Sequence, residues 1–314
     1  MTTQIETTVE EQVEAYQPEN SIHSAITITD ESFAELRDYV YHHSGIYLTE
    51  NKKRLLEKRM SSRLSTLGFG DFSAYLKHLK QLSGQGKELN SLIDIVTVNE
   101  TSFFRNEFQL KALENVVFPE IFEKKTSNND QLFRILCVGC SSGEEPYTLA
   151  MILNHRFSEK LKEVKVEIIG TDISQQVVKR AYEGIYKEFS LKNVEREYLQ
   201  KYFTRRGDNF VLNQDIRRVV HFRQVSTIDE SQMKSLGMFD LILCRNVLIY
   251  FKQESKTKAV NTLYQILNPG GYLFVGHSES LYGIEHEFRF VHFVKAIGYQ
   301  KPDLPERKSH REGD

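Results

Sequence analysis

In the first third of the chain, apolar side chains recur at intervals of three and four residues, which predicts a series of amphipathic helices. Asp30 and Asp71 are the expected N-caps of two of them, because an aspartate side chain accepts a backbone N–H of the first turn. Gly68 is expected to end the second helix, at about residues 51–67, and residues 83–86 are expected to form a loop. The predicted apolar stripes are Phe33, Leu36 and Val40; Leu56, Met60, Leu64 and Leu67; Phe72, Tyr75, Leu76 and Leu79; and Leu89, Leu92, Ile93 and Val96.

After Phe118-Pro119 the pattern changes to short apolar runs that alternate with helical segments. This alternation indicates a mostly parallel sheet covered by helices on both faces. The run Phe288–Tyr299 follows the last strand without a helical segment between, so it predicts an antiparallel return. A largely parallel sheet closed by a hairpin is the layout of Rossmann-like methyltransferases rather than of dehydrogenases. The expected strands are Leu132–Val138, Val164–Gly170, Phe239–Cys244 and Tyr272–Val275.

The length of 314 residues exceeds what one hydrophobic core usually organises, which favours two domains or one domain with a substantial appendage. Alternation at Phe210–Leu212 and Val219-Val220 predicts a small antiparallel β insert at about residues 200–223. The first residues combine several glutamates with few large apolar side chains, so we expect them to be flexible. The expected boundaries are 1–24 for an acidic tail, 25–97 for an all-helical domain, 98–303 for an α/β domain and 304–314 for a second tail.

The charge balance of 41 Lys plus Arg against 43 Asp plus Glu provides no global positive field for nucleic acid. No apolar run approaches the roughly eighteen residues of a membrane span, and the amino terminus lacks the pattern of an export signal. Cys137, Cys140 and Cys244 are too few for a disulfide framework. We therefore expect a cytoplasmic protein without membrane insertion.

Gly139 and Gly143 lie in a short loop between an expected strand and the start of a helix, where backbone can approach a ligand closely. Glu144 and Glu145 follow at once, and carboxylates there repel a pyrophosphate but favour a cation such as S-adenosylmethionine. Asp172 ends the next strand, where one carboxylate can accept from both hydroxyls of a ribose. The alternatives are an ordinary turn whose acids interact with the helix dipole, and an aspartate that only caps a helix.

Two further segments carry candidate site residues. Residues 245–250 follow a buried strand at the end where open α/β sheets bind ligands, although Tyr250 would also suit a core. Residues 99–105 interleave polar and aromatic side chains where the two domains meet, which indicates a cleft or an interdomain seam. Cys137 and Cys140 form a C-x-x-C pattern, but without a second cysteine pair we interpret them as small buried thiols rather than a zinc site.

The second predicted helix is strongly basic. Lys52, Arg59 and Arg63 fall within about 40° of one another at 3.6 residues per turn. A solvated face, a nucleic-acid contact and a contact with an acidic protein partner are all compatible with this arrangement.

Taken together, five segments in this order resemble the CheR-type chemotaxis receptor glutamate methyltransferases. The similarity spans about residues 26 to 300. It implies an all-helical amino-terminal domain followed by a Rossmann-like S-adenosylmethionine-dependent methyltransferase domain with a small antiparallel β insert. The matching segments are Asn99–Arg105, Val138–Tyr147, Thr171-Asp172, Leu243–Phe251 and Asn268–Glu279.

The resemblance implies a role for individual residues. Glu145 is expected to face the cofactor's ammonium, Asp172 its ribose, and Arg105 its carboxylate or the mouth of the site. Ser226-Thr227 stands where the family has an Asn-Leu pair near the adenine. The implied cofactor-binding residues are Asn99, Thr101, Arg105, Glu145, Asp172, Ser226, Thr227, Asn246 and Val247.

The resemblance also implies the reaction, methyl transfer from S-adenosylmethionine to a receptor glutamate, which gives a glutamyl methyl ester and S-adenosylhomocysteine. A glutamate with a pKa of about 4.3 is already ionised at neutral pH, so neither a general base nor a metal is expected. Arg105 and Tyr250 are the expected catalytic residues, because a cation and a phenol O–H both suit an anionic oxygen.

The expected partner is the acidic helical region of a chemotaxis receptor, contacted by Lys52, Arg59 and Arg63. The predicted insert looks shorter than in members that dock a receptor's tail peptide, so we expect direct recognition of receptor helices by a monomer. The alternatives are a non-catalytic adaptor that binds the cofactor or receptor, and a nucleic-acid methyltransferase, which the near-neutral charge disfavours.

Overall fold

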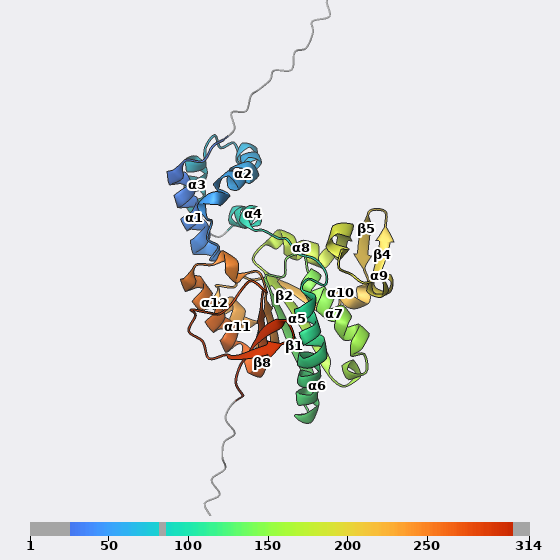
Figure 1. Cartoon of the computed structure of the whole chain (residues 1–314). Helices are drawn as coiled ribbons and strands as arrows, with labels where there is room; N and C mark the ends of the chain where they lie inside the picture. Colours follow the sequence, from blue (N-terminus) through green and yellow to red (C-terminus); the bar gives the residue numbers. More distant parts are fainter. Residues whose placement is uncertain (1–25, 82–85, 304–314) are drawn as a thin grey trace, which may run out of the picture.

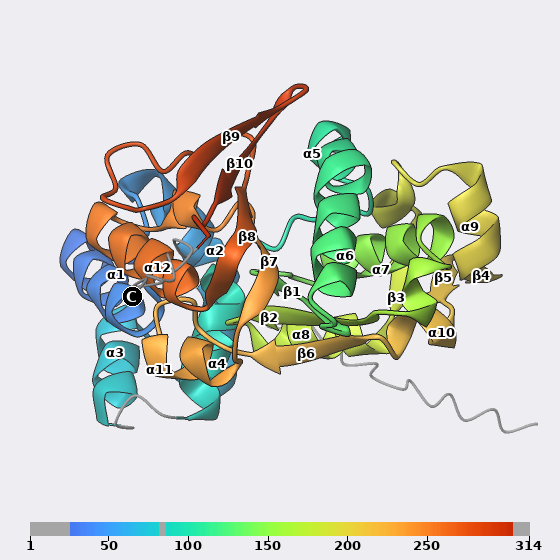
Figure 2. The same ribbon diagram turned by 90° about the horizontal axis from the view of Figure 1, so that it is seen from below.

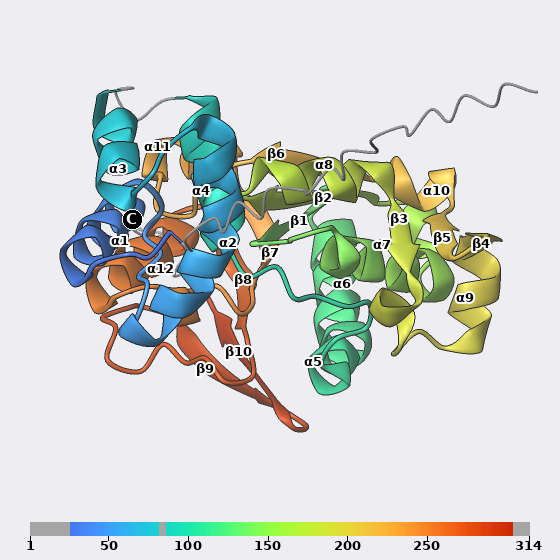
Figure 3. The ribbon, with the colours of Figure 1, turned by 90° about the horizontal axis from the view of Figure 1, so that it is seen from above.

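The computed structural model describes residues 26–81 and 86–303; the predicted tails at 1–24 and 304–314, and residues 83–85 of the predicted loop, lie outside this description. A helical part packs against one side of an α/β part, and a small second sheet lies at the opposite end of the molecule (Figure 1 and Figure 3). Among the described helices, none has the length and apolar character that a bilayer span requires.

The helical part buries the predicted apolar stripes, apart from Leu67 and Leu89, which are partly exposed. Its stripes join the helices that cover one face of the large sheet in a single continuous core. The two parts therefore share apolar packing rather than meeting through a polar seam. The helices are α1 (Asp30–Ser44), the 3-10 helix η1 (Glu50–Lys52), α2 (Lys53–Leu67), α3 (Phe72–Gln81) and α4 (Lys87–Val96).

Two of the three predicted helix ends in this part are confirmed, and one is wrong. Gly68 ends α2 in the left-handed conformation with φ of 77°, as predicted. Asp71 accepts the backbone N–H of the residue three positions on at 2.8 Å, which confirms it as a cap. The prediction that Asp30 caps α1 is wrong, because the Thr29 hydroxyl accepts the Ser32 N–H and Asp30 is already helical.

The large sheet has the strand order β6-β2-β1-β7-β8-β10-β9. The first five strands in this order are parallel, and β10 is antiparallel to both β8 and β9. The predicted parallel sheet closed by a hairpin is thus confirmed (Figure 2). The strands are β1 (Leu132–Val138), β2 (Lys165–Asp172), β6 (Val220–Gln224), β7 (Phe239–Cys244), β8 (Leu267–Val275), β9 (Arg289–Phe293) and β10 (Ala296–Gln300).

Helices cover both faces of this sheet. The side chains of β1 and β7 alternate between the two cores, one containing α11 and α12 and the other containing α5 to α7. Burial on both faces explains why these strands are almost continuously apolar. The covering helices are α5 (Glu107–Ala112), η2 (Leu113–Val117, a π-helical turn), α6 (Phe118–Ser127), α7 (Glu144–Arg156), the 3-10 helix η3 (Lys160–Lys162), α8 (Gln175–Glu183), α11 (Glu230–Ser235) and α12 (Gln253–Gln265).

The β insert differs from its prediction. Val220 begins β6, which pairs with β2 at the edge of the large sheet, so Val219-Val220 is not part of the insert. In β6, Val220 and Phe222 are buried while their neighbours are exposed. The apolar and polar residues therefore alternate as they would in a strand of the insert. The insert instead begins earlier and has the strand order β3-β5-β4. Its elements are β3 (Ile185–Lys187), η4 (Glu188–Leu191), α9 (Arg196–Tyr202), β4 (Phe203–Arg206), β5 (Asn209–Leu212) and α10 (Gln214–Arg217).

Candidate active site

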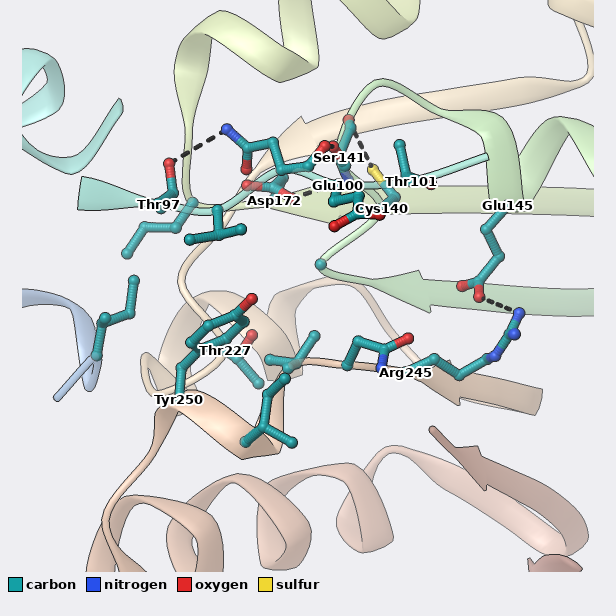
Figure 4. A pocket seen from close by; sticks show the side chains of 18 of the residues that line it. Thr97, Glu100, Thr101, Cys140, Ser141, Glu145, Asp172, Thr227, Arg245 and Tyr250 are labelled. Carbon is teal, nitrogen blue, oxygen red and sulfur yellow. Dashed lines mark hydrogen bonds and ion pairs between the residues drawn. The ribbon is translucent and has the colours of Figure 1, made fainter. Parts of the chain in front are cut away.

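A cavity of about 320 Å³ lies at the carboxyl ends of β1, β2 and β7, under the segment that leaves α4 (Figure 4). Open α/β sheets bind ligands at this edge. The cavity brings together, as lining residues, the whole set predicted to bind the cofactor or to catalyse, although their individual roles remain predictions. This set is Asn99, Thr101, Arg105, Glu145, Asp172, Ser226, Thr227, Asn246, Val247 and Tyr250.

The loop after β1 passes close to the opposite wall of the cavity. Gly139 has a φ of 66°, and a Cβ added there would lie well under 3.0 Å from a Val247 methyl group. Gly143 is also left-handed, with a φ of 91°. Both conformations are accessible to glycine at little steric cost. The two glycines therefore allow the tight loop that the sequence predicted.

Asp172 ends β2 with its carboxylate held by backbone amides. Its Oδ2 accepts the Ser141 N–H and its Oδ1 accepts the Ser174 N–H, both at 2.9 Å. Burial raises the pKa of Asp172, and these amide contacts oppose that rise. The N-cap of α8 is Ser174, so the alternative that Asp172 only caps this helix is wrong. Asp172 has acceptor capacity left for a ligand in the cavity.

Glu145 lies in the first turn of α7 and pairs with Arg245. Arg245 Nη1 donates to Glu145 Oε2 at 2.8 Å (Figure 4). Arg245 Nη2 donates to the Arg105 carbonyl, also at 2.8 Å. Burial raises the pKa of the Glu145 carboxyl, and the Arg245 charge opposes this. Arg245 therefore joins the β7 loop, the α7 start and the 99–105 segment. Arg245 belongs to the segment 245–250 that the sequence analysis selected, but its pairing with Glu145 was not predicted.

Tyr250 closes the cavity from the 3-10 helix η5 (Leu248–Tyr250). Burial raises the pKa of its phenol, so the group remains an O–H donor at neutral pH. Arg105 lines the same cavity, and its positive charge opposes the rise in the pKa of both Tyr250 and Glu145. Its Nη1 donates to the Glu100 carbonyl at 3.0 Å.

The helical part contributes to the cavity in a way that the sequence did not indicate. Ser44 and Ile46, just after α1, are lining residues. Ile46 forms an antiparallel bridge with Phe251, and the Tyr47 N–H donates to the Tyr250 carbonyl at 2.8 Å. These contacts join segments about 200 residues apart, which periodicity within a segment cannot reveal.

The three cysteines are buried free thiols, which confirms the interpretation of Cys137 and Cys140 as small buried thiols. Of these, Cys140 also lines the cavity.

The basic face predicted for the second helix lies outside the cavity lining. Arg59 donates to the Ile95 and Thr97 carbonyls at 2.9 and 3.1 Å.

The other two members of the predicted basic face differ in their surroundings. Arg63 pairs with the buried Glu88 carboxylate, which also accepts the Tyr75 hydroxyl at 2.7 Å. Lys52 lies exposed in η1. Arg59 and Arg63 thus already have partners within the helical part and its linker.

Comparison with known proteins supports the family resemblance found in the sequence. The family model for the CheR methyltransferase all-alpha domain matches residues 31–97, and the model for the CheR methyltransferase SAM binding domain matches residues 99–297. Chemotaxis protein methyltransferase 2 of Vibrio cholerae is 39% identical over 278 residues, which cover 88% of this chain and 95% of that protein.

Other relatives are similar over comparable lengths. A chemotaxis protein methyltransferase of Borreliella burgdorferi is 37% identical, with 90% of this chain and 98% of the relative covered. One from Escherichia coli is 32% identical, with 84% and 89% covered. The chain therefore belongs to the CheR family of S-adenosylmethionine-dependent chemotaxis methyltransferases.

Proposed function

We propose that this chain methylates glutamate side chains of a chemotaxis receptor, producing glutamyl methyl esters and S-adenosylhomocysteine. The observation that carries the proposal is that a neutral phenol, Tyr250, and a guanidinium, Arg105, line the same cavity as the carboxylates of Glu145 and Asp172. The names of the relatives, which are chemotaxis protein methyltransferases, support the receptor as substrate.

The lining of the cavity fits S-adenosylmethionine. Glu145 and Asp172 would hold the ammonium and the ribose, because both are acceptor groups that line the cavity. The Ser226 hydroxyl is buried without a hydrogen-bond partner among the described residues, so it is free to contact the adenine end. When bound, the cofactor supplies an electrophilic methyl group on a sulfonium.

The chain's own residues would then orient the acceptor. A glutamate carboxylate is ionised at neutral pH, so the site must attract and align it rather than deprotonate it. Arg105 would attract the anion, and the Tyr250 O–H would donate to one oxygen so that the other faces the methyl group. Partial burial of Tyr250 limits competing hydrogen bonds from water.

The decisive experiment is transfer of radiolabelled methyl groups to membranes that carry a chemotaxis receptor. We expect label in the receptor band and its release by mild alkali, as an ester requires. A receptor whose candidate glutamates are replaced by alanine is the matched control. Alkali-stable label would contradict a glutamyl ester, and label in added RNA or DNA would favour the nucleic-acid alternative.

Cofactor affinity is expected to fall with decreasing pH. The raised pKa of Asp172 means that the group takes up a proton above the ordinary aspartate value of about 3.9, and a neutral carboxyl accepts ribose hydroxyls less well. By linkage, this group's contribution to stability without ligand rises over the same window, because the folded chain binds the proton more readily than the unfolded one.

Calorimetric titration with S-adenosylhomocysteine from pH 8 to pH 5 measures this effect. Asp172→Asn is expected to bind more weakly at pH 8 and to show a flatter pH dependence than the wild type. A wild-type slope retained in Asp172→Asn would assign the pH dependence to another group.

We further propose that Lys52, Arg59 and Arg63 contact the acidic receptor helices. Charge reversal at Lys52 is the cleanest test, because reversal at Arg59 or Arg63 also removes contacts within the enzyme. Lys52→Glu is expected to raise the KM for receptor roughly three- to tenfold and to weaken its salt dependence, since exposed charges act mainly on association.

Lys77→Glu, on the exposed side of α3 in the same domain, is the matched control. Equal salt dependence of receptor methylation in the wild type and Lys52→Glu would exclude this surface as the docking site.

A further inference from the structure

Glu279, in the loop between β8 and β9, binds the backbone of the loop that carries Tyr250. Its Oε2 accepts the Asn246 N–H and the Gly276 N–H, both at 2.6 Å, and its Oε1 accepts the Ile249 N–H at 3.1 Å. The carboxylate is not part of the cavity lining. Three backbone donors on one partly buried carboxylate form a charge-assisted cluster, which is stronger than neutral hydrogen bonds.

Gly276 leaves room for this arrangement. A Cβ at Gly276 would lie 2.5 Å from Glu279 Oε2 and 3.0 Å from the Asn246 nitrogen. The end of β8 can therefore approach the Asn246 loop closely only because residue 276 has no side chain.

The loop that Glu279 holds begins with a residue in the left-handed conformation. Asn246 has a φ of 59°, which asparagine adopts more readily than most other residues with a side chain. The N–H groups bound by Glu279, at Asn246 and Ile249, lie on both sides of Val247, and Ile249 immediately precedes Tyr250. Val247 and Tyr250 both line the cavity. The contacts therefore hold the backbone just before each of these two lining residues, at Asn246 before Val247 and at Ile249 before Tyr250.

We propose that Glu279 is a positioning residue for methyl transfer, which holds the left-handed Asn246 loop so that Val247 faces the cofactor and the Tyr250 hydroxyl faces the acceptor. The part that concerns the acceptor rests on the proposed function. Glu279 reaches the residue next to Tyr250, because its Oε1 accepts the Ile249 N–H.

The test is a double-mutant cycle between Glu279→Gln and Tyr250→Phe, with kcat measured on receptor membranes and S-adenosylhomocysteine affinity measured by calorimetry. Glu279→Gln replaces one of the two oxygens that accept the three N–H groups by an NH2 group, which cannot accept them. We expect it to lower kcat about tenfold or more in the wild type but less than threefold in Tyr250→Phe, because coupled residues are not additive. We also expect about a threefold loss of S-adenosylhomocysteine affinity.

Two further variants separate positioning from charge and from folding. Glu279→Asp keeps the charge but is too short to reach the nitrogens of both Asn246 and Ile249, so its kcat is expected to stay low. Glu285→Gln, an exposed acid on the same loop, is expected to match the wild type.

Additive losses in the cycle, or a wild-type kcat together with unchanged affinity in Glu279→Gln, would overturn the proposal. If the wild type itself forms no methyl ester, the proposed function fails, whereas the affinity measurement still tests whether Glu279 holds the cofactor side of the loop.

Discussion

Replacement of Gly139 by alanine is expected to lower the affinity for S-adenosylhomocysteine by at least about tenfold, equivalent to about 1.4 kcal/mol. Two costs act together at this position. A side chain at a φ of 66° strains the backbone by about 1–2 kcal/mol, and its Cβ would collide with Val247 on the opposite wall of the cavity. Relief of this collision moves either the loop or Val247, and both line the cavity.

Gly207→Ala is the matched control. Gly207 has a φ of 59° in the turn between β4 and β5, and a Cβ there would meet no atom within 4 Å. Thermal melting is expected to show a larger destabilisation in Gly139→Ala, which has both costs, than in Gly207→Ala, which has the backbone strain alone, and calorimetry is expected to show loss of binding only in Gly139→Ala. If Gly139→Ala binds as tightly as Gly207→Ala does, the cofactor does not occupy the space beside this loop.

The second large effect is expected for Tyr250→Phe, with kcat lowered about 10- to 100-fold and S-adenosylhomocysteine affinity changed less than about twofold. Removal of an active-site donor to developing charge typically costs about 10²–10³ in kcat. Here the acceptor's charge is present from the start and is consumed during transfer, so the hydroxyl contributes orientation, and we expect the lower range. Single-turnover methylation of receptor membranes measures the chemical step directly.

Tyr282→Phe provides the control, because this tyrosine is 95% exposed on the loop that also carries Glu279. Equal transfer rates in the wild type and Tyr250→Phe would remove the phenol from the mechanism and leave Arg105 as the remaining candidate for orienting the acceptor.

The sequence predicted those features that depend on neighbouring residues. The strands β1 and β7 have the predicted bounds, because burial on both faces leaves a continuous apolar run between polar ends. The cavity residues were found from short segments, since the carboxyl ends of parallel strands meet at one edge. Asp172 illustrates this: a strand end and an acid sufficed to place it in the cavity.

Features that depend on distant segments were missed or misplaced. The edge strand β6 was assigned to the insert because its alternation does not show which strand it pairs with. The Arg245–Glu145 pair joins residues 100 positions apart, and no local pattern links them. The three-residue strand β3 is too short to produce a periodic signal, so the insert's first strand was not predicted.

The antiparallel bridge between Ile46 and Phe251 has a consequence for protein engineering. The loop after α1 and the loop after β7 are hydrogen-bonded to each other through their backbones. The position of Tyr250 therefore depends on residues of both domains. A chimera that takes its helical domain from a relative with different receptor preference would therefore have to import the matching residues around Tyr250 as well, or lose turnover while its specificity changes.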